Sequence, residues 1–199
     1  MDEKRNITKA AGLMSVATFI SRILCYLNDI ILAVFFGATG LSDTFFVAFR
    51  IPNLLRELFA EGSMSSAVIP VLTEYQTKYG AQEAKRLVRI IFTSITIFVG
   101  LICVLGIIFA PAIVTAIAPG FLNMPDKFSL TVLLTRLMFP FLLFISFAAI
   151  VMGALNTRRI FFIPAVAPAM LNITIIAAVL LLVQGMEQPI IAVAIGVAI

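Results

Sequence analysis

Long apolar runs alternate with short polar segments along most of this sequence. A helix that crosses the hydrocarbon core of a bilayer needs about 20 mostly apolar residues. Two stretches, Ile90–Ala118 and Ile160–Met186, contain no charged residue. The pattern therefore predicts an all-α, polytopic transmembrane helix bundle with about five to six spans. The expected spans are 12–36, 42–75, 88–111, 129–153, 160–184 and the truncated segment 188–199.

The second run, 42–75, is too long for one straight span. Pro52 lacks the N–H that would bond the carbonyl of Ala48, so a kink is expected there. Gly62 and Ser63 predict a further bend, or an extension of the helix beyond the membrane. The last run, 188–199, is too short to span a bilayer. We therefore expect the whole sequence of 199 residues to be the opening part, or a fragment, of a longer membrane protein.

The basic residues are distributed unequally between the polar connections. If the N-terminus is inside, the only basic residue of the outer loops is Lys127. Basic residues concentrate in cytoplasmic loops, so the bias predicts a cytoplasmic N-terminus. Met1–Lys9 is charged and leads directly into a full-length span, which is not the pattern of a cleaved signal peptide. The basic residues on the predicted cytoplasmic side are Lys4, Arg5, Lys9, Lys78, Lys85, Arg86, Arg89, Arg158 and Arg159.

Composition supports a membrane protein and argues against several other classes. Hydrophobic residues make up 62% of the chain and charged residues 12%, against about 25% charged in soluble proteins. The net charge of +4 does not indicate nucleic-acid binding, because the basic residues are scattered among apolar spans. Cys25 and Cys103 both lie in apolar runs, and the sequence contains no histidine. No nucleophile–base pair or metal-ligand cluster is evident, so we expect no enzyme activity, metal or cofactor.

Charged residues nevertheless occur in or at the edge of the predicted spans. A charge at the centre of a membrane helix costs about 2.5–3.5 kcal/mol on insertion scales, so each needs a partner, water or access to the surface. Arg136 lies near a span end, where snorkelling or a local structural bond is expected. The other charges are concentrated in the first two spans and favour a water-filled cavity between them. They are Arg22, Asp29, Asp43, Arg50, Arg56, Glu57 and Glu61.

Helical spacing groups these charges into one polar stripe per helix. Residues seven apart in an α-helix return to within about 20° of the same direction. Arg22 and Asp29 therefore share a face, with Tyr26 between them. In the second span the stripe consists of Asp43, Arg50, Asn53, Glu57 and Glu61. Arg56 is expected to point about a third of a turn away from that stripe.

Two interpretations of the stripes remain open. In the first, Arg22–Asp29 and Arg50–Glu57 are neutralising pairs that hold the bundle together. Two turns separate the partners by about 10 Å, which is long for contact within one helix, but pairing between helices is possible. In the second, the cavity binds an anion, and its arginines would suit a phosphate or diphosphate head group. The acidic residues would then orient the arginines or form gate contacts.

Several long strings in the sequence resemble one known family. They are SRILCYLND (21–29), FGATGLSDTFFVAFRIPNLLRELFAEGSMSSAVIPVLTEY (36–75), TRLMFPFLLFISFAAIVMGALNT (135–157) and PAVAPAMLNI (164–173). They are similar to the MurJ/MviN family of flippases, in the multidrug/oligosaccharidyl-lipid/polysaccharide exporter superfamily. The resemblance implies a two-lobed helix bundle with a central cationic cavity, of which this chain supplies most of the N-terminal lobe. It also implies transport of lipid II, the diphosphate-linked peptidoglycan precursor, across the bacterial inner membrane by alternating access.

The resemblance assigns expected roles to individual residues. Ser21, Arg22, Leu24 and Asp29 match the family's first-span motif S-R-x-L-G-x-x-R-D, in which Cys25 replaces the glycine and Asn28 replaces the second arginine. Asp43, Asn53, Arg56, Glu61 and Gly62 match the second-span motif. The expected substrate-binding residues are Ser21, Arg22, Asn28, Arg50 and Arg56. The expected supporting or gate residues are Asp29, Asp43, Asn53, Glu57 and Glu61.

The expected partners are lipid II, membrane lipids and the remaining C-terminal lobe of the same protein. Asn28 leaves open a second function, export of a different lipid-linked oligosaccharide or amphiphile. A third alternative is a membrane scaffold that transports nothing and whose buried charges are structural.

Overall fold

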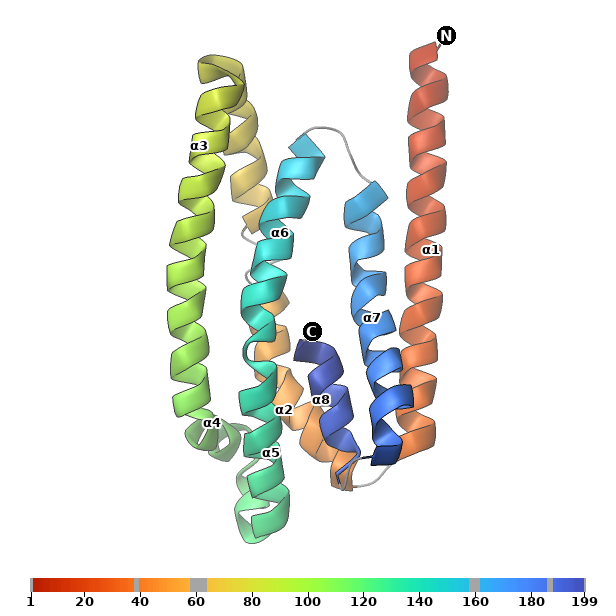
Figure 1. Ribbon diagram of the computed structural model, residues 1–199, viewed down its shortest axis with the longest axis vertical. Coiled ribbons are helices and arrows are strands. Elements are labelled where there is room, and N and C mark those ends of the chain that lie inside the picture. Colours follow the sequence, from red (N-terminus) through yellow and green to blue (C-terminus); the bar gives the residue numbers. More distant parts are fainter. Residues whose placement is uncertain (1, 38–39, 58–63, 158–161, 186–187, 199) are drawn as a thin grey trace.

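A computed structural model describes residues 2–37, 40–57, 64–157, 162–185 and 188–198. The prediction of an all-α bundle is confirmed, and the described residues contain no strand. The longer helices run roughly along one axis of an elongated bundle (Figure 1). The elements are α1 (Asp2–Phe36), α2 (Gly40–Arg56), α3 (Met64–Ile108), α4 (Ala110–Ile117), η2 (Pro119–Asn123), α5 (Pro125–Met138), α6 (Phe141–Thr157), α7 (Phe162–Leu182), η3 (Val183–Gly185) and α8 (Ile190–Ala198).

Three described segments are long and apolar enough to cross a membrane: Ser15–Phe36, Pro70–Ile108 and Pro125–Leu155. A shorter apolar segment follows at Ala169–Leu182. The first helix begins at Asp2, so the charged leader is helical as well and extends the run expected at 12–36. The helix α8 ends about halfway along the bundle (Figure 1).

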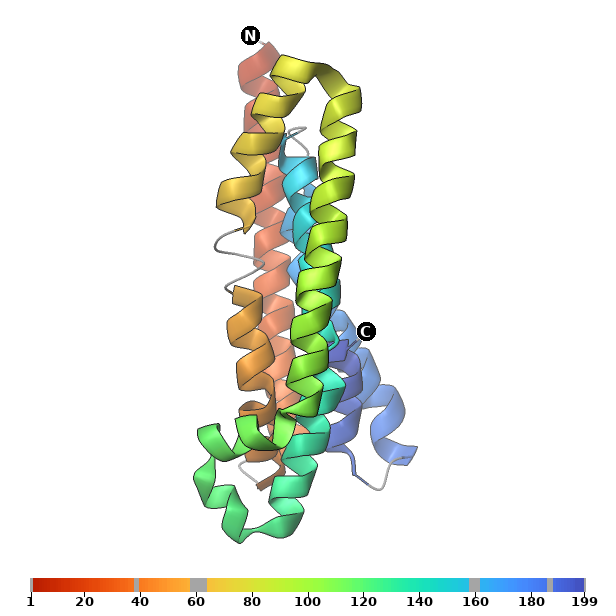
Figure 2. The same cartoon turned by 90° about the vertical axis from the view of Figure 1, so that its left-hand side faces the viewer.

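The run expected as one bent span over 42–75 is divided between two helices. The first, α2, ends at Arg56, and the second, α3, begins at Met64. The two lie end to end along the bundle, so that α2 ends near its mid-height (Figure 2). Pro52 is buried inside α2. The bend expected at Gly62 and Ser63 lies outside the described residues.

The helix α3 is a hairpin with arms 64–79 and 81–108. Gly80, with φ 83° and ψ 174°, is the only break in it, and the chain reverses there (Figure 2). A positive φ is a conformation that glycine adopts without the steric penalty of a Cβ. The reversal lies between the runs expected as spans, 42–75 and 88–111, and both arms remain helical up to Gly80.

The run expected as one span over 129–153 is interrupted between α5 and α6. Pro140 supplies no N–H, and the chain tightens there as Leu142 N–H bonds the carbonyl of Phe139 at 3.0 Å. Phe139 is fully buried beside Gly106 of α3, where a Cβ would lie 2.0 Å from the phenyl ring. A glycine at this position thus allows α3 and the α5–α6 junction to approach closely.

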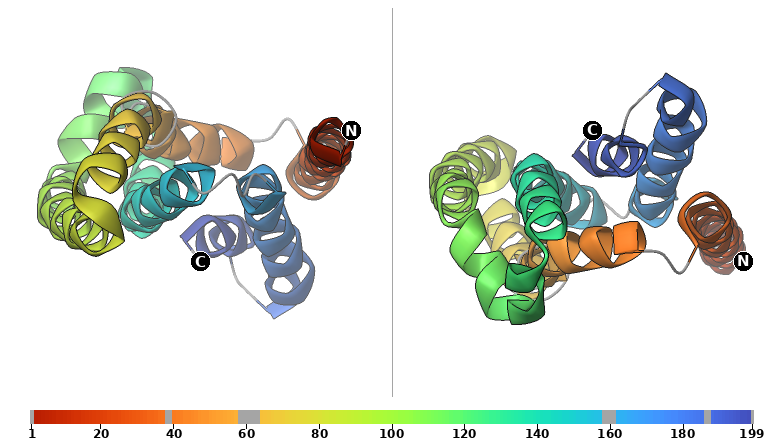
Figure 3. Two further views of the ribbon diagram at one scale, coloured as in Figure 1. Left: turned by 90° about the horizontal axis from the view of Figure 1, so that it is seen from above. Right: turned by 90° about the horizontal axis from the view of Figure 1, so that it is seen from below.

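The apolar core lies among α2, α5, α7 and α8. Leu134, Met138, Val179, Val193 and Val197 have no exposed surface there. A second cluster joins α3 to α6 through Val99, Cys103 and Leu142. The helix α1 stands at one side of the bundle and packs mainly against α7 (Figure 3).

Candidate functional site

The face of α1 that packs inward is adjacent to the face that carries the charges. Ala17 and Asn28 are buried, and Ser21 and Leu24 are half-buried between them. These residues recur every three or four positions, as expected for one side of a helix. Arg22 and Asp29 lie about 100° around the helix from Ser21 and Asn28, and both are exposed. The predicted cavity residues of the first span therefore divide between two faces.

Asn28 lies in the packed face rather than beside Arg22. Its side chain is 8% exposed, and its Oδ1 has no hydrogen-bond partner among the described residues. A buried polar atom without a partner is unfavourable, because it has lost its bonds to water. This residue stands where the family motif has an arginine.

A network of polar side chains lies at the C-terminal end of α2. Arg56 Nε donates to Asn53 Oδ1 at 3.0 Å, and Asn53 Nδ2 donates to Glu57 Oε1 at 3.1 Å. Arg56 Nη2 lies 3.8 Å from the same Glu57 oxygen. Asn53 lies three positions before Arg56 and four before Glu57, the spacings at which side chains on a helix surface meet. The Asn53 amide thus holds the Arg56 guanidinium in place. The Arg56 side chain is only 22% exposed.

This network corrects two expectations about the second span. Arg56 was expected to point away from the polar stripe, but its long side chain reaches back to Asn53 and Glu57. The described partners of Glu57 are Asn53 and Arg56, so the neutralising pair Arg50–Glu57 is not formed. Arg50 is exposed. Glu61 lies outside the described residues.

Asp43 is paired at the other end of α2. Its Oδ2 accepts a hydrogen bond from Lys127 Nζ at 2.8 Å, and this ion pair joins α2 to the first turn of α5. The same ammonium lies 4.6 Å from the centre of the Phe121 ring. From the sequence, Lys127 was expected only as an outer-loop charge. A usable signal was that Asp43 and Lys127 both flank predicted outer loops and carry opposite charges.

Arg22 and Arg56 lie at a similar depth along the long axis of the bundle. The end of α1 and the start of α2 are joined at the same end of the bundle (Figure 1). Arg22 precedes Phe36 by fourteen residues and Arg56 follows Gly40 by sixteen, which is about 21 Å and 24 Å along the two helices. Asp29 lies closer to that end and lines a cavity of about 380 Å³ with Gly37, Ser42 and Phe46.

Arg136 forms the local bond that was one of its two expected roles. Its Nε donates to the carbonyl of Ile107 at 3.2 Å, one of the last carbonyls of α3. Such carbonyls have no partner within their own helix. No group of three metal-binding side chains occurs in the part of the chain that the structure describes.

These features define the class as a multi-pass α-helical membrane protein whose first two helical regions carry charges at matching depth. Comparison with known families refines this class. A family model described as "Lipid II flippase MurJ" matches residues 32–199. The chain belongs to the MurJ family, whose members are transporters of the bacterial inner membrane rather than enzymes.

Individual relatives agree with the family model. A "Probable lipid II flippase MurJ" from Buchnera aphidicola subsp. Acyrthosiphon pisum is 42% identical over 86% of this chain and 34% of its own length. A "Lipid II flippase MurJ" from Burkholderia cenocepacia is 38% identical over 95% of this chain and 37% of its own length. A solved structure titled "Lipid II flippase MurJ, inward closed conformation" is 32% identical with a TM-score of 0.76, covering 94% of this chain and 39% of the other. The chain thus spans little more than a third of the relatives that it matches.

Proposed function

We propose that this chain forms the N-terminal lobe of a flippase that moves lipid II from the cytoplasmic to the outer face of the bacterial inner membrane. The observation that carries this proposal is the Arg56–Asn53–Glu57 network at the end of α2. Family membership supports the choice of lipid II, since the relatives named above are described as lipid II flippases. Lipid II that reaches the outer face is then the precursor for cell-wall synthesis.

The position of the network suits a transporter. Substrate sites of many secondary transporters lie near the bilayer midplane, where spanning helices are interrupted. Arg56 is the last residue of α2, which ends near the mid-height of the bundle and is followed end to end by the first arm of α3 (Figure 2). An arginine held there can bind a diphosphate through paired donors.

Arg22 and Arg56 are the proposed head-group ligands, and Arg50, Ser21 and Asn28 are further candidates. Asn53 and Glu57 hold Arg56 in place, while Asp29, Asp43 and Glu61 are proposed to support the cavity or its gate. Arg22 and Arg56 lie at similar depths on α1 and α2, and we propose that one extended head group reaches both. The C-terminal lobe of the same protein encloses the opposite side of the cavity.

The proposed orientation has a cytoplasmic N-terminus. The N-terminal end of α1 lies at the same end of the bundle as the Gly80 reversal of α3 (Figures 1 and 2). The helical segments on either side of that reversal carry Lys78, Lys85, Arg86 and Arg89. An excess of basic residues marks the cytoplasmic side of a membrane protein. This end of the bundle therefore faces the cytoplasm.

Transport follows alternating access between the two lobes. The lipid tail stays in the bilayer while the polar head group passes through the cavity. With a potential that is negative inside, outward movement of a doubly negative head group is downhill by about 4.6 kcal/mol per 100 mV. The membrane field can therefore help to drive export.

A second candidate function is export of a different lipid-linked oligosaccharide or amphiphile. The observation that favours it is the buried Asn28, since an arginine stands at this position in the family motif. Asn28→Arg separates the two functions. A lipid II carrier keeps or gains activity with the added cation, whereas a carrier of another head group loses activity.

The test of the main proposal is depletion of the full-length protein in cells. Lipid II should then accumulate on the cytoplasmic face, which a membrane-impermeant enzyme that cleaves exposed lipid II can measure. Wild-type protein should restore export, whereas Arg22→Gln and Arg56→Gln should not. Arg86→Gln is the matched control, because Arg86 is exposed and lies on the α3 hairpin. An unchanged distribution of lipid II after depletion would refute the proposal.

A further inference from the structure

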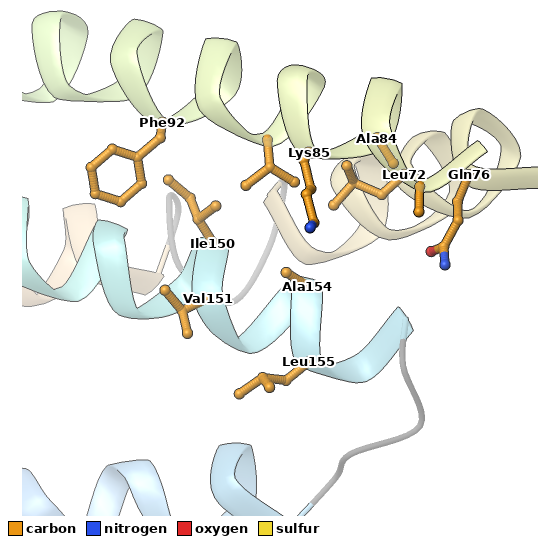
Figure 4. Close-up of a pocket in the computed structure, with 11 residues that line it drawn as sticks. Leu72, Gln76, Ala84, Lys85, Phe92, Ile150, Val151, Ala154 and Leu155 are labelled. Carbon is orange, nitrogen blue, oxygen red and sulfur yellow. The ribbon is translucent and has the colours of Figure 1, made fainter. Parts of the chain in front are cut away.

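An apolar groove lies between the α3 hairpin and α6, at the basic end of the bundle. Its volume is about 280 Å³. Leu72 comes from the first arm of α3, Lys85 and Phe92 from the second arm, and Ile150, Val151 and Ala154 from α6 (Figure 4). The groove lies on the α3 side of the molecule, whereas α1 with Arg22 stands on the opposite side (Figure 1). Neither Arg22 nor Arg56 lines the groove, so it is separate from the proposed site for the transported head group.

One cation is directed into this apolar groove. The Lys85 ammonium points from α3 toward the space beside α6 (Figure 4). Two other basic residues of the hairpin are paired: Lys78 bonds Glu74 at 2.6 Å, and Arg86 lies 3.9 Å from Glu83. No described acidic side chain forms a salt bridge with Lys85. The groove thus offers an anion a counter-charge at one end and apolar walls along the rest.

The depth of the groove matches the boundary between lipid head groups and acyl chains. Lys85 precedes the apolar run 88–111 by less than one turn, and Phe92 lies about 10 Å further along the helix. The rings of Tyr75 and Tyr79, on the other arm, are in contact, with centroids 4.7 Å apart and planes tilted by 46°. Tyrosines are enriched at this interface because their rings are apolar and their hydroxyls are polar. Moving from Lys85 to Phe92 therefore means moving from head-group depth into hydrocarbon.

We propose that this groove binds one anionic phospholipid of the surrounding membrane, with its phosphate on Lys85 and one acyl chain along Phe92 and Val151. The volume is near the lower limit of ligand pockets, about 300 Å³, and suits a single chain. Lysine binds phosphate as a point charge and can reach the interface on its flexible stem. Assignment of the lipid to the cytoplasmic leaflet rests on the proposed orientation, whereas the binding itself does not. Such a lipid fills the space between the α3 arms and α6 and so stabilises their packing.

The test is native mass spectrometry of the full-length protein with two lipids that share the same acyl chains. Phosphatidylglycerol should be retained better than phosphatidylcholine. Lys85→Gln should lower retention of phosphatidylglycerol by about fivefold, the effect of one basic residue near an anionic lipid surface. Lys85→Arg should preserve the preference. Arg86→Gln removes the same charge at the next position, but Arg86 does not line the groove, so retention should be unchanged.

A groove-filling variant tests the apolar part separately. Ala154→Phe should reduce retention of both lipids, because the added ring occupies the path of the acyl chain. Equal retention of the two lipids, or equal losses in Lys85→Gln and Arg86→Gln, would overturn the head-group assignment. If the folded Ala154→Phe variant retains both lipids as well as the wild type does, the acyl chain does not bind in this groove. Lipid II export measured on the same variants distinguishes this inference from the proposed function, since lipid retention can hold even if export fails.

Discussion

Lys127 and Asp43 form an ion pair with an N–O distance of 2.8 Å, and this pair joins the start of α5 to the start of α2. The Asp43 side chain is 62% exposed, so water screens much of the attraction. The pair lies at the end of the bundle opposite to the Gly80 reversal (Figure 1). The ion pair connects α2 to α5 but contributes little to the free energy of unfolding.

The pair predicts weak, salt-dependent coupling between Asp43 and Lys127. A double-mutant cycle with Asp43→Asn and Lys127→Gln should give a coupling of about 0.2–1 kcal/mol in the free energy of unfolding at low salt. Thermal unfolding of the four proteins in detergent, at low and high salt, measures this coupling. A coupling that does not fall as salt rises would show that the contact is not mainly electrostatic.

Gly80 should be sensitive to substitution because of its backbone and not because of crowding. Gly80→Ala is expected to destabilise the hairpin by about 1–3 kcal/mol, because φ 83° with ψ 174° is a backbone conformation that is essentially confined to glycine. A Cβ would meet nothing within 4 Å at Gly80 or at Gly100. Gly100→Ala, in the second helical arm, is the matched control and should be neutral or stabilising. Equal changes in Tm for the two variants would contradict the explanation.

Gly106 should be sensitive for the opposite reason. Its Cβ would lie within 2.0–2.4 Å of three atoms of the Phe139 ring, which is fully buried. Gly106→Ala is therefore expected to cost about 1–3 kcal/mol through overpacking. Adding Phe139→Leu, which removes ring atoms, should recover part of that loss. Thermal unfolding measures the stability of both variants. If the losses of stability from Gly106→Ala and Phe139→Leu simply add, the Phe139 ring is not the source of the strain.

Hydropathy predicted the helical class, because a long apolar run identifies a membrane helix without knowledge of its contacts. It also placed a reversal between the runs 42–75 and 88–111, where Gly80 lies. It could not place the interruption at Phe139–Pro140, since single residues hardly change the average over a window. Seven-residue spacing grouped the charges of each helix by direction alone. It missed the Arg56–Asn53–Glu57 network because its hydrogen bonds join residues three and four positions apart, spacings that a seven-residue search does not sample. The Asp43–Lys127 pair depends on the packing of α2 beside α5, which no pattern within one helix contains.

Transport should depend on the geometry of Arg56 and not only on its charge. Arg56 Nε donates to Asn53 Oδ1, and a lysine has no equivalent planar group. Arg56→Lys should therefore lower lipid II export by the full-length protein about tenfold or more, as expected for loss of one charged hydrogen bond. Asn53→Ala should also lower export, because it releases the guanidinium. Lys78→Gln removes an exposed charge on the α3 hairpin and serves as the control. Full activity of Arg56→Lys would assign Arg56 a purely electrostatic role.

Asn28 distinguishes a structural role from a ligand-binding role at a position where the family motif has an arginine. Its Oδ1 is buried without a partner among the described residues, and such a group costs about 1–3 kcal/mol. Asn28→Leu, similar in size but apolar, should therefore raise the Tm of the protein in detergent. Asn53→Leu is the control, and it should lower the Tm because the Asn53 amide is fully engaged with Arg56 and Glu57.

The same variant then reports on the substrate. If Asn28 serves only the packing of α1, Asn28→Leu should export lipid II as well as the wild type does while gaining stability. If Asn28 leaves the packed face and binds the head group during transport, export should fall although the protein is more stable. A gain in Tm with a loss of export would therefore show that Asn28 is kept for the substrate, because function would then oppose the free energy of folding at this residue.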